Sequence, residues 1–149
     1  MKVVFLDFDG VMTKPQNILS TKHEGLEFDK EAVKKVKHLL DSTGAKIVVS
    51  SSWREGKKDA DMVKILKVYG LDSYYLGKLP DTYFDEFPDK ELDFITYVGN
   101  NPEISDFVII DDFIIFEYQA KQIATELREG LMAIPDKVIN QHITRLNLN

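Results

Sequence analysis

The chain of 149 residues contains no cysteine. This absence excludes disulfides, thiolate metal sites and a cysteine nucleophile, and it leaves the redox compartment undetermined. The three histidines are too scattered along the chain to predict a histidine metal triad. The sequence therefore predicts neither a thiolate metal site nor a histidine triad.

Long hydrophobic runs and an excess of basic residues are also absent. The first apolar run is interrupted by Asp7, a pattern typical neither of a signal peptide nor of a membrane span. We therefore expect a cytoplasmic protein without a membrane partner, with export by a route that needs no cleaved signal as the open alternative. The formal net charge of −6 opposes a surface that coats nucleic acid but permits a local basic rim for a single phosphate.

The overall composition is that of a globular protein. Hydrophobic residues make up 44% of the chain and charged residues 30%, which is typical of one domain with a sizeable core. We find no internal repeat, linker or low-complexity tract. The sequence therefore predicts a single domain over residues 1–149.

Short apolar strands alternate with amphipathic helices along the chain. Strands are predicted at 3–6, 47–49 and 107–110 with a short one within 122–127, and helices after Asp29, at 59–69, from Lys90 and after Pro135. Asp29 is expected to cap the first helix and Gly44 to end it. Segments 13–28 and 71–88 are predicted to be loops. The alternation predicts an α/β protein with a mainly parallel central sheet.

The stretch from Val3 to Met12 places two carboxylates where a buried strand ends. Asp7 and Asp9 would point to the same side of an extended chain, and Gly10 would let the backbone turn directly after them. Gly10 would then lie beside any ligand bound at these carboxylates. Two carboxylates this close resist burial together, which favours a divalent cation or a shared proton. The alternative is ordinary turn chemistry, since Asp and Gly are common after strands.

Three serines, a tryptophan and an arginine follow the second predicted strand. Hydroxyls, free backbone amides and a guanidinium at the carboxyl end of a strand are typical of an anion-binding site. We therefore expect Ser50, Ser51 and Arg54 to bind substrate. The alternative is helix N-capping by one of the serines. Trp53 is expected to pack rather than to stack on a ligand.

The third predicted strand ends in Asp111 and Asp112. Because the carboxyl ends of parallel strands meet at one edge of a sheet, these carboxylates are expected to lie near Asp7 and Asp9. Lys90 begins a predicted helix, where a positive charge opposes the helix dipole, and this placement is compatible with a functional role.

Four motifs in this order resemble the haloacid dehalogenase (HAD) superfamily of aspartyl-phosphate phosphatases. They are DFDGV at 7–11, IVVS ending at Ser50, Lys90 before a helix, and IIDD ending at Asp112. More narrowly, SSSWR at 50–54 and GL at 130–131 resemble the small capless HAD domain of Swiss Army Knife RNA-repair proteins. The resemblance extends from Val3 to about His142. It implies a Rossmann-like three-layer α/β/α sandwich without a cap domain.

The resemblance also implies a role for each motif. Asp7 would be the nucleophile that forms an aspartyl-phosphate, and Asp9 the general acid and then the base. Ser50 would hydrogen-bond the phosphoryl oxygens. Lys90 would neutralise charge on the phosphoryl group and on Asp7, although Lys78 also lies in range of this motif. An acid two residues after the nucleophile favours hydrolysis over the other reactions of the superfamily.

The cofactor implied is Mg²⁺, because oxygen ligands with retained waters suit this ion better than zinc. Positioned positive charges are the main source of catalysis in phosphoryl transfer. The implied ligands are the carboxylates Asp7, Asp9, Asp111 and Asp112 and the backbone carbonyl of Phe8.

The distances between motifs leave no room for a folded cap domain. The site would therefore be open to a macromolecular phosphate, either a polynucleotide end or a phosphoprotein side chain such as phosphotyrosine, or would borrow a cap from another subunit. Two alternatives of another class stay open, namely a receiver-like phospho-Asp signalling domain and a catalytically silent interaction module. The receiver fits less well because the middle strand here ends in serines, and the silent module because every expected catalytic group is present.

Overall fold

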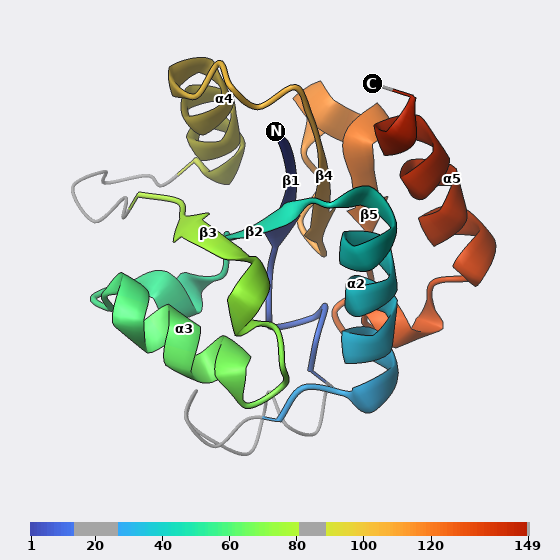
Figure 1. Cartoon of the computed structure of the whole chain (residues 1–149), viewed down its shortest axis with the longest axis horizontal. Helices are drawn as coiled ribbons and strands as arrows, with labels where there is room; N and C mark the ends of the chain where they lie inside the picture. The colour runs from blue at the N-terminus through green and yellow to red at the C-terminus, as the bar shows by residue number, and fades with distance from the viewer. Residues whose placement is uncertain (14–26, 81–88, 149) are drawn as a thin grey trace.

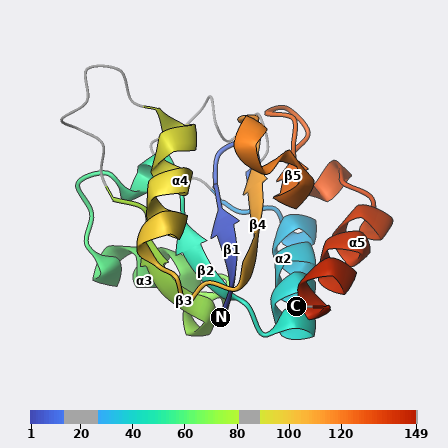
Figure 2. The same cartoon turned by 90° about the horizontal axis from the view of Figure 1, so that it is seen from above.

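The computed structural model describes residues 1–13, 27–80 and 89–148. Within these residues five parallel strands form one sheet, in the order β3-β2-β1-β4-β5 (Figure 2). Their bounds are β1 Lys2–Leu6, β2 Lys46–Val49, β3 Tyr75–Lys78, β4 Asp106–Asp111 and β5 Gln122–Ala124. The predicted α/β fold with a parallel sheet is confirmed.

Helices cover both faces of this sheet, as Figure 1 shows for α4 on one side and α2 beside α5 on the other. The α-helices are α2 Lys30–Thr43, α3 Asp59–Lys67, α4 Lys90–Asn100 and α5 Asp136–Asn147. Short 3-10 helices are η2 Ser52–Arg54, η3 Asp72–Tyr74, η4 Phe116–Lys121 and η5 Leu131–Ala133. The arrangement is the three-layer Rossmann-like sandwich expected of a HAD fold. In the described part of the chain, no helix is both long enough and apolar enough to span a membrane.

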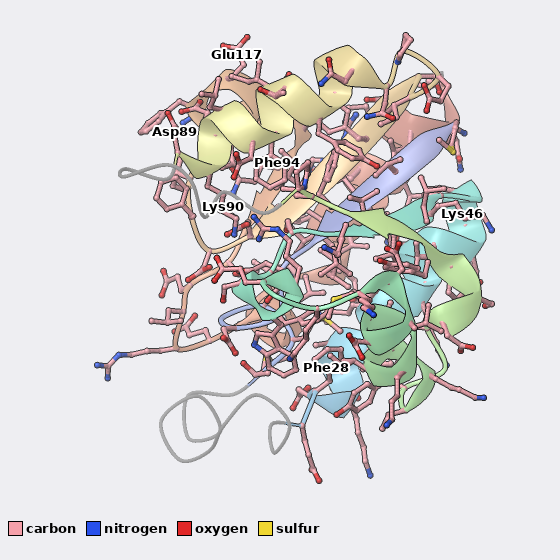
Figure 3. The ribbon with its side chains drawn as sticks, turned by 90° about the vertical axis from the view of Figure 1, so that its left-hand side faces the viewer. Phe28, Lys46, Asp89, Lys90, Phe94 and Glu117 are labelled. Carbon is pink, nitrogen blue, oxygen red and sulfur yellow. The ribbon has the colours of Figure 1, made fainter. Side chains whose placement is uncertain are left out.

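The two faces of β1 belong to two separate cores, because successive strand side chains point in opposite directions. Val4 and Leu6 pack with residues of α2, α3 and α5, whereas Val3 and Phe5 pack with Phe94 of α4. Figure 3 shows Phe94 one turn after Lys90 on α4. All four of these β1 side chains are fully buried, which accounts for the continuous apolar run of a central parallel strand.

The strand order reverses direction at β1. The chain first adds β2 and β3 on one side of β1 and then crosses over through α4 to add β4 and β5 on the other side. Ligands of open α/β sheets bind beyond the carboxyl ends of the strands at such a reversal. The fold therefore favours a site at the ends of β1 and β4.

The helix termini of α2 follow the sequence expectations. The Asp29 carboxylate accepts hydrogen bonds from the backbone N–H groups of Glu31 and Ala32, and Gly44 ends the helix in a left-handed conformation with φ +70°. Because Asp29 satisfies two otherwise unpaired N–H groups, its role as N-cap is confirmed.

One strand was missed, since residues 71–88 were expected to form a loop. The edge strand β3 lies within this segment and pairs with β2 from Ile47↔Tyr75 to Val49↔Lys78, with an irregularity in between. Its side chains are half-buried or exposed and it contains Gly77, so it lacks the apolar run and the alternation by which strands are recognised. The short helix η3 also lies in this segment, whereas residues 81–88 of it, and residues 14–26 of the other predicted loop, lie outside the described residues.

The amino ends of the strands carry a buried charge cluster. Asp106, at the start of β4, is 2% exposed and accepts hydrogen bonds from Arg145 of α5, from Lys121 and from the N–H of Phe107. Arg145 also donates to the carbonyl of Phe107 at 2.9 Å. These contacts connect α5 to the sheet at the edge opposite to the carboxyl ends.

Candidate active site

Three strand ends bring Ser50, Asp7 and Asp111 side by side. The register pairs Leu6 with Val49 of β2 and with Ile110 of β4, so the next residue of each strand lies at the same level. The ladder continues to these positions, because Asp7 N donates to Ile110 O at 3.1 Å and Ser50 N donates to Leu6 O at 3.0 Å. Residues about 40 and 100 positions apart in the sequence thus meet at the carboxyl edge.

Carboxylates and one ammonium group make up the centre of the site. Carboxylate oxygens of Asp7, Asp111 and Asp112 lie within 4.8 Å of one another. The Lys90 ammonium lies 2.6 Å from Asp111 Oδ2 and 3.8 Å from Asp7 Oδ2. Figure 3 shows Lys90 at the amino-terminal end of α4. Lys78, the other lysine considered for this role, ends β3, which is separated from β1 by β2.

Burial strongly affects the protonation of these groups. The Asp7 carboxyl is 5% exposed, and its pKa is raised well above 3.8 by burial, with Lys90 acting in the opposite direction and Asp111 and Asp112 adding to the rise. Burial likewise raises the pKa of Asp111, again against the effect of Lys90. One ammonium therefore does not offset the carboxylate cluster, and a divalent cation would fit the remaining negative charge.

The turn after β1 is shaped by Asp112. Gly10 has φ +80°, and a Cβ atom at this position would lie 2.9 Å from Asp112 Oδ2. The Gly10 carbonyl accepts a hydrogen bond of 2.7 Å from the buried Thr125 hydroxyl, and Thr125 N donates to Asp111 O at 3.1 Å. The structure thus explains Gly10 by the close approach of a site carboxylate. Thr125 was not identified from the sequence, because a threonine after a short strand carries no distinctive signal.

The loop that carries Asp111 and Asp112 is fixed by the side chain of Gln122. Its amide nitrogen donates to Phe113 O at 2.8 Å and Asp111 O at 3.3 Å, and its oxygen accepts from Ile115 N at 2.9 Å. Asp111 Oδ1 accepts from Phe113 N at 2.9 Å. These bonds hold the carboxylates in place before any ligand binds. Gln122 was also missed, since only its tertiary partners reveal its role.

The three residues of the predicted anion-binding site, Ser50, Ser51 and Arg54, use their side chains differently in the structure. Ser50 is fully buried, and its hydroxyl has no hydrogen-bond partner among the described residues, which suits a ligand oxygen. Ser51 instead caps η2, with its hydroxyl accepting from Trp53 N at 3.2 Å. Ser51 is therefore an N-cap, as in the alternative interpretation of this segment.

Arg54, which was also expected to bind substrate, is buried and directs its guanidinium to main-chain carbonyls. Arg54 is 5% exposed, and its guanidinium donates to the carbonyls of Ser50 at 2.8 Å, Ser51 at 3.0 Å and Leu79 at 3.1 Å. Asp93 of α4 lies 3.8 Å from it. Because the donors of Arg54 are used within the protein, this residue holds the serine segment at 50–52 against the segment after β3.

The Phe8 carbonyl and the Asp9 carboxylate, which were also expected to bind the metal, accept hydrogen bonds from within the protein. The Phe8 carbonyl accepts from Val11 N at 3.1 Å and Met12 N at 2.7 Å, so both of its lone pairs are used within the turn. Asp9 lies outside the set of three clustered carboxylates in the described residues, and its Oδ2 accepts a hydrogen bond of 3.0 Å from the indole of Trp53. Among the described residues, Asp7, Asp111 and Asp112 are thus the carboxylates close enough together to share a metal ion.

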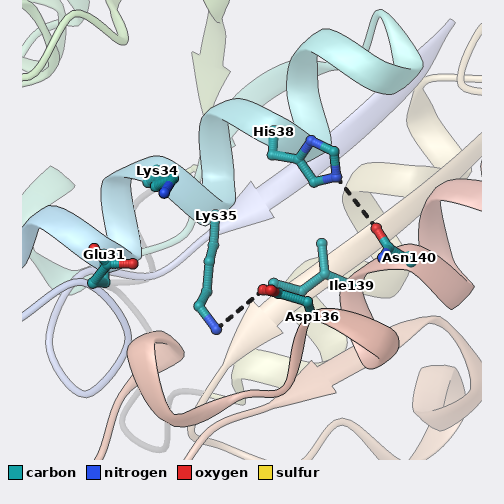
Figure 4. A pocket seen from close by; sticks show the side chains of 7 residues that line it. All are labelled: Glu31, Lys34, Lys35, His38, Asp136, Ile139 and Asn140. Carbon is teal, nitrogen blue, oxygen red and sulfur yellow. Dashed lines mark hydrogen bonds and ion pairs between the residues drawn. The ribbon is translucent and has the colours of Figure 1, made fainter.

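A pocket between α2 and α5 contains none of the expected site residues (Figure 4). Its polar side chains pair with one another across the two helices: Lys35 lies 3.5 Å from Asp136, and His38 Nε2 lies 3.2 Å from Asn140 Oδ1. This pocket is a helix–helix groove, and the chemistry is gathered at the strand ends instead.

A parallel sheet with carboxylates and a lysine at its switch point is the arrangement expected of the HAD class. Residues 3–134 match the family described as HAD domain in Swiss Army Knife RNA repair proteins, and the chain belongs to this family. The resemblance seen in the sequence is thereby confirmed, and membership indicates a phosphatase-type hydrolase. No curated protein and no solved structure matches the chain.

Proposed function

We propose that this protein is a Mg²⁺-dependent phosphomonoester hydrolase that acts through an aspartyl-phosphate on Asp7. The observation that carries the proposal is the surroundings of Asp7, whose buried carboxyl lies beside two further carboxylates and 3.8 Å from the Lys90 ammonium. A carboxylate attacks a phosphate dianion only where positive charge offsets their repulsion. Membership of the HAD family supports the same chemistry.

Asp7, Asp111 and Asp112 would hold the Mg²⁺ ion. Their oxygens lie close enough together to share one ion, and hard oxygen donors are the ligands this ion prefers. When bound, the ion would supply the positive charge that the single ammonium does not provide. HAD proteins typically use Mg²⁺, which agrees with the donor set.

The remaining residues divide the work of binding and proton transfer. The Ser50 hydroxyl, without a partner among the described residues, would donate to a phosphoryl oxygen, and Lys90 would neutralise the charge beside it. Asp7 attacks phosphorus while the bond to the leaving oxygen breaks and Asp9 protonates that oxygen. Asp9 then takes a proton from the water that hydrolyses the aspartyl-phosphate, which restores both carboxyls.

The first test is hydrolysis of p-nitrophenyl phosphate by the wild-type protein and by Asp7→Asn. We expect turnover that requires Mg²⁺ and that falls at least about a thousandfold in the variant, because the nucleophile is lost. Circular dichroism would verify that the variant is folded. Absence of turnover in folded wild-type protein with Mg²⁺ would contradict the proposal and favour a silent interaction module or a receiver-like domain.

We propose a polynucleotide end as the physiological phosphate. In the described residues the segment between β1 and β2 contains a single helix, α2, and no folded cap domain. The side chains of Phe113 and Leu127 beside the site are 55% and 50% exposed. Exposed apolar side chains next to a phosphate site suit the flat face of a base. The RNA-repair proteins after which the family is described favour the same class of substrate.

This substrate is tested by comparing kcat/KM on oligonucleotides with 5′- or 3′-phosphates and on a phosphotyrosine peptide. We expect kcat/KM for one of the oligonucleotides to exceed that for p-nitrophenyl phosphate by at least about tenfold, since bases beside the phosphate add binding energy. Preference for the peptide would show that the open site serves a phosphoprotein.

A further inference from the structure

A hydrogen bond joins the serine-rich loop to the expected general acid. The indole Nε1 of Trp53 donates to Asp9 Oδ2 at 3.0 Å across 44 positions of sequence. An indole nitrogen is only a donor, so Oδ2 is the acceptor in this pair. The two residues come from the loops after β2 and β1, which are adjacent strands.

The indole ring is itself held firmly in place. Trp53 is 3% exposed and packs edge-on against Phe8, with ring centroids 5.1 Å apart. The ring centroid of Phe28 lies 6.0 Å from that of Trp53. Its backbone N–H donates to the Ser51 hydroxyl. The direction of the Nε1–H bond is therefore fixed by packing before substrate binds.

The hydrogen bond makes the two Asp9 oxygens different from each other. The indole N–H donates to Oδ2, and the carbonyl oxygen of a protonated carboxyl is the better acceptor, so this bond favours Oδ1 as the oxygen that carries a proton. Oδ1 is buried and has no hydrogen-bond partner among the described residues. A buried oxygen without a partner calls for an explanation, and a role in the reaction accounts for it because Asp9 lies two residues after Asp7.

We propose that Trp53 is a positioning residue that orients the Asp9 carboxyl for proton transfer to the leaving group. This inference rests on the proposed phosphatase function. In the step concerned, Asp7 forms a bond to phosphorus, the bond from phosphorus to the leaving oxygen breaks, and the Oδ1 proton of Asp9 moves to that oxygen. Without the indole N–H the carboxyl rotates freely about its side-chain bonds, and fewer molecules present Oδ1 correctly.

The test uses Trp53→Phe, which keeps an aromatic ring and removes the N–H. The substrates are aryl phosphates of similar shape, p-nitrophenyl phosphate with a good leaving group and p-methoxyphenyl phosphate with a poor one. We expect kcat/KM, which reports the leaving-group step, to fall about tenfold or more for the poor leaving group and less than about threefold for the good one. Equal losses on both substrates, or none, would overturn the role of Trp53.

A matched control is Phe107→Leu, which removes an aromatic ring from the core on the other face of the sheet and leaves the indole and its ring contacts intact. We expect this variant to lose stability and to keep the wild-type ratio of the two kcat/KM values. Inactivity of wild-type protein on both substrates with Mg²⁺ would overturn the phosphatase function itself. Activity of wild type with an unchanged ratio in Trp53→Phe would overturn only the positioning role.

A spectroscopic measurement tests the hydrogen bond without catalysis. Trp53 is the single tryptophan of the chain, so its indole N–H gives one resonance in a ¹H–¹⁵N spectrum. We expect this resonance to move upfield in Asp9→Ala, because the acceptor is removed, and to stay in place in Phe113→Ala. An unchanged resonance in Asp9→Ala would show that the contact is absent in solution and would overturn the inference.

Discussion

The guanidinium of Arg54 is surrounded by main-chain carbonyls, although its place after three serines resembles an anion site. The carbonyls of Ser50, Ser51 and Leu79 accept its hydrogen bonds, and its side chain is almost completely buried. The sequence could not distinguish the two roles, because the carbonyl of Leu79 becomes a neighbour only when β3 pairs with β2.

We predict that Arg54→Met lowers the free energy of unfolding by about 3 kcal/mol, because methionine fills part of the volume and leaves buried carbonyls without donors. The KM for p-nitrophenyl phosphate should stay within about twofold of wild type. Urea denaturation and steady-state kinetics measure the two quantities. A tenfold higher KM at unchanged stability would instead return Arg54 to the substrate site.

Asp7 links the site to stability. Burial raises its pKa in the folded protein, so the folded state binds this proton more tightly than the unfolded chain does. The resulting contribution to stability is complete below the unfolded pKa of about 3.8, and it is lost as the pH rises through the higher folded value. As the pH rises and the metal-free protein loses this contribution, the buried Asp7 carboxyl works against folding.

We predict that Asp7→Asn is more stable than wild type at pH 7 in EDTA, by about 1 kcal/mol. The difference should shrink toward pH 4, where the wild-type carboxyl gains its proton, and Mg²⁺ should stabilise only the wild type strongly. Urea denaturation between pH 4 and 8 measures both effects. Asp136→Asn is the control, since the Asp136 side chain is 87% exposed, and a gain in Asp7→Asn that does not depend on pH would contradict the linkage.

At the scale of elements, the turn after β1 and the loop after β4 depend on each other. Thr125 connects Gly10 to Asp111, and the space that a side chain at Gly10 would need is taken by Asp112. The carboxylates proposed to bind Mg²⁺ and the turn after the proposed nucleophile are therefore held together by direct contacts. A change in the turn should be transmitted to the metal.

We predict that Gly10→Ala weakens Mg²⁺ binding by at least about tenfold, because the new methyl group displaces the Asp112 carboxylate. The control is Gly44→Ala, which has a similar positive φ of +70° but no atom of the described residues within 4 Å of the added Cβ. Both variants should lose about 1 kcal/mol of stability from the left-handed backbone. Isothermal titration measures the Mg²⁺ affinity, and equal affinities in the two variants would refute the coupling.

The sequence predicted the elements best where local signals and burial agree. The apolar run of β1, the cap at Asp29 and the stop at Gly44 each have a local physical cause, and each is confirmed. The edge strand β3 was missed because its exposure leaves no pattern. The site was predicted as a set of strand ends, whereas the bond between Trp53 and Asp9 depends on the packing of two loops and has no signal in the chain.

At the scale of the whole molecule, the two edges of the sheet have different roles. The carboxyl edge carries the site, and the amino edge carries Asp106 with its ion pairs to Arg145 and Lys121. A buried acid is stable only with such partners. The amino edge therefore contributes to folding without touching the site.

We predict that Arg145→Met lowers the free energy of unfolding by about 2–3 kcal/mol, since it removes the guanidinium that pairs with the buried Asp106 carboxylate. The kcat/KM for p-nitrophenyl phosphate should stay within about twofold of wild type at a temperature well below the unfolding transition. A large loss of kcat/KM in fully folded protein would show that the two edges are coupled.

The central position of β1 also affects how the protein is made. Of the described strands β1 leaves the ribosome first, yet both of its hydrogen-bonding edges wait for partners, and β4 is synthesised some hundred residues later. During that interval a strand of four fully apolar, fully buried side chains has no finished sheet to enter, and such strands pair readily with other chains. Nascent chains of this protein are therefore expected to depend on chaperones until β4 has emerged.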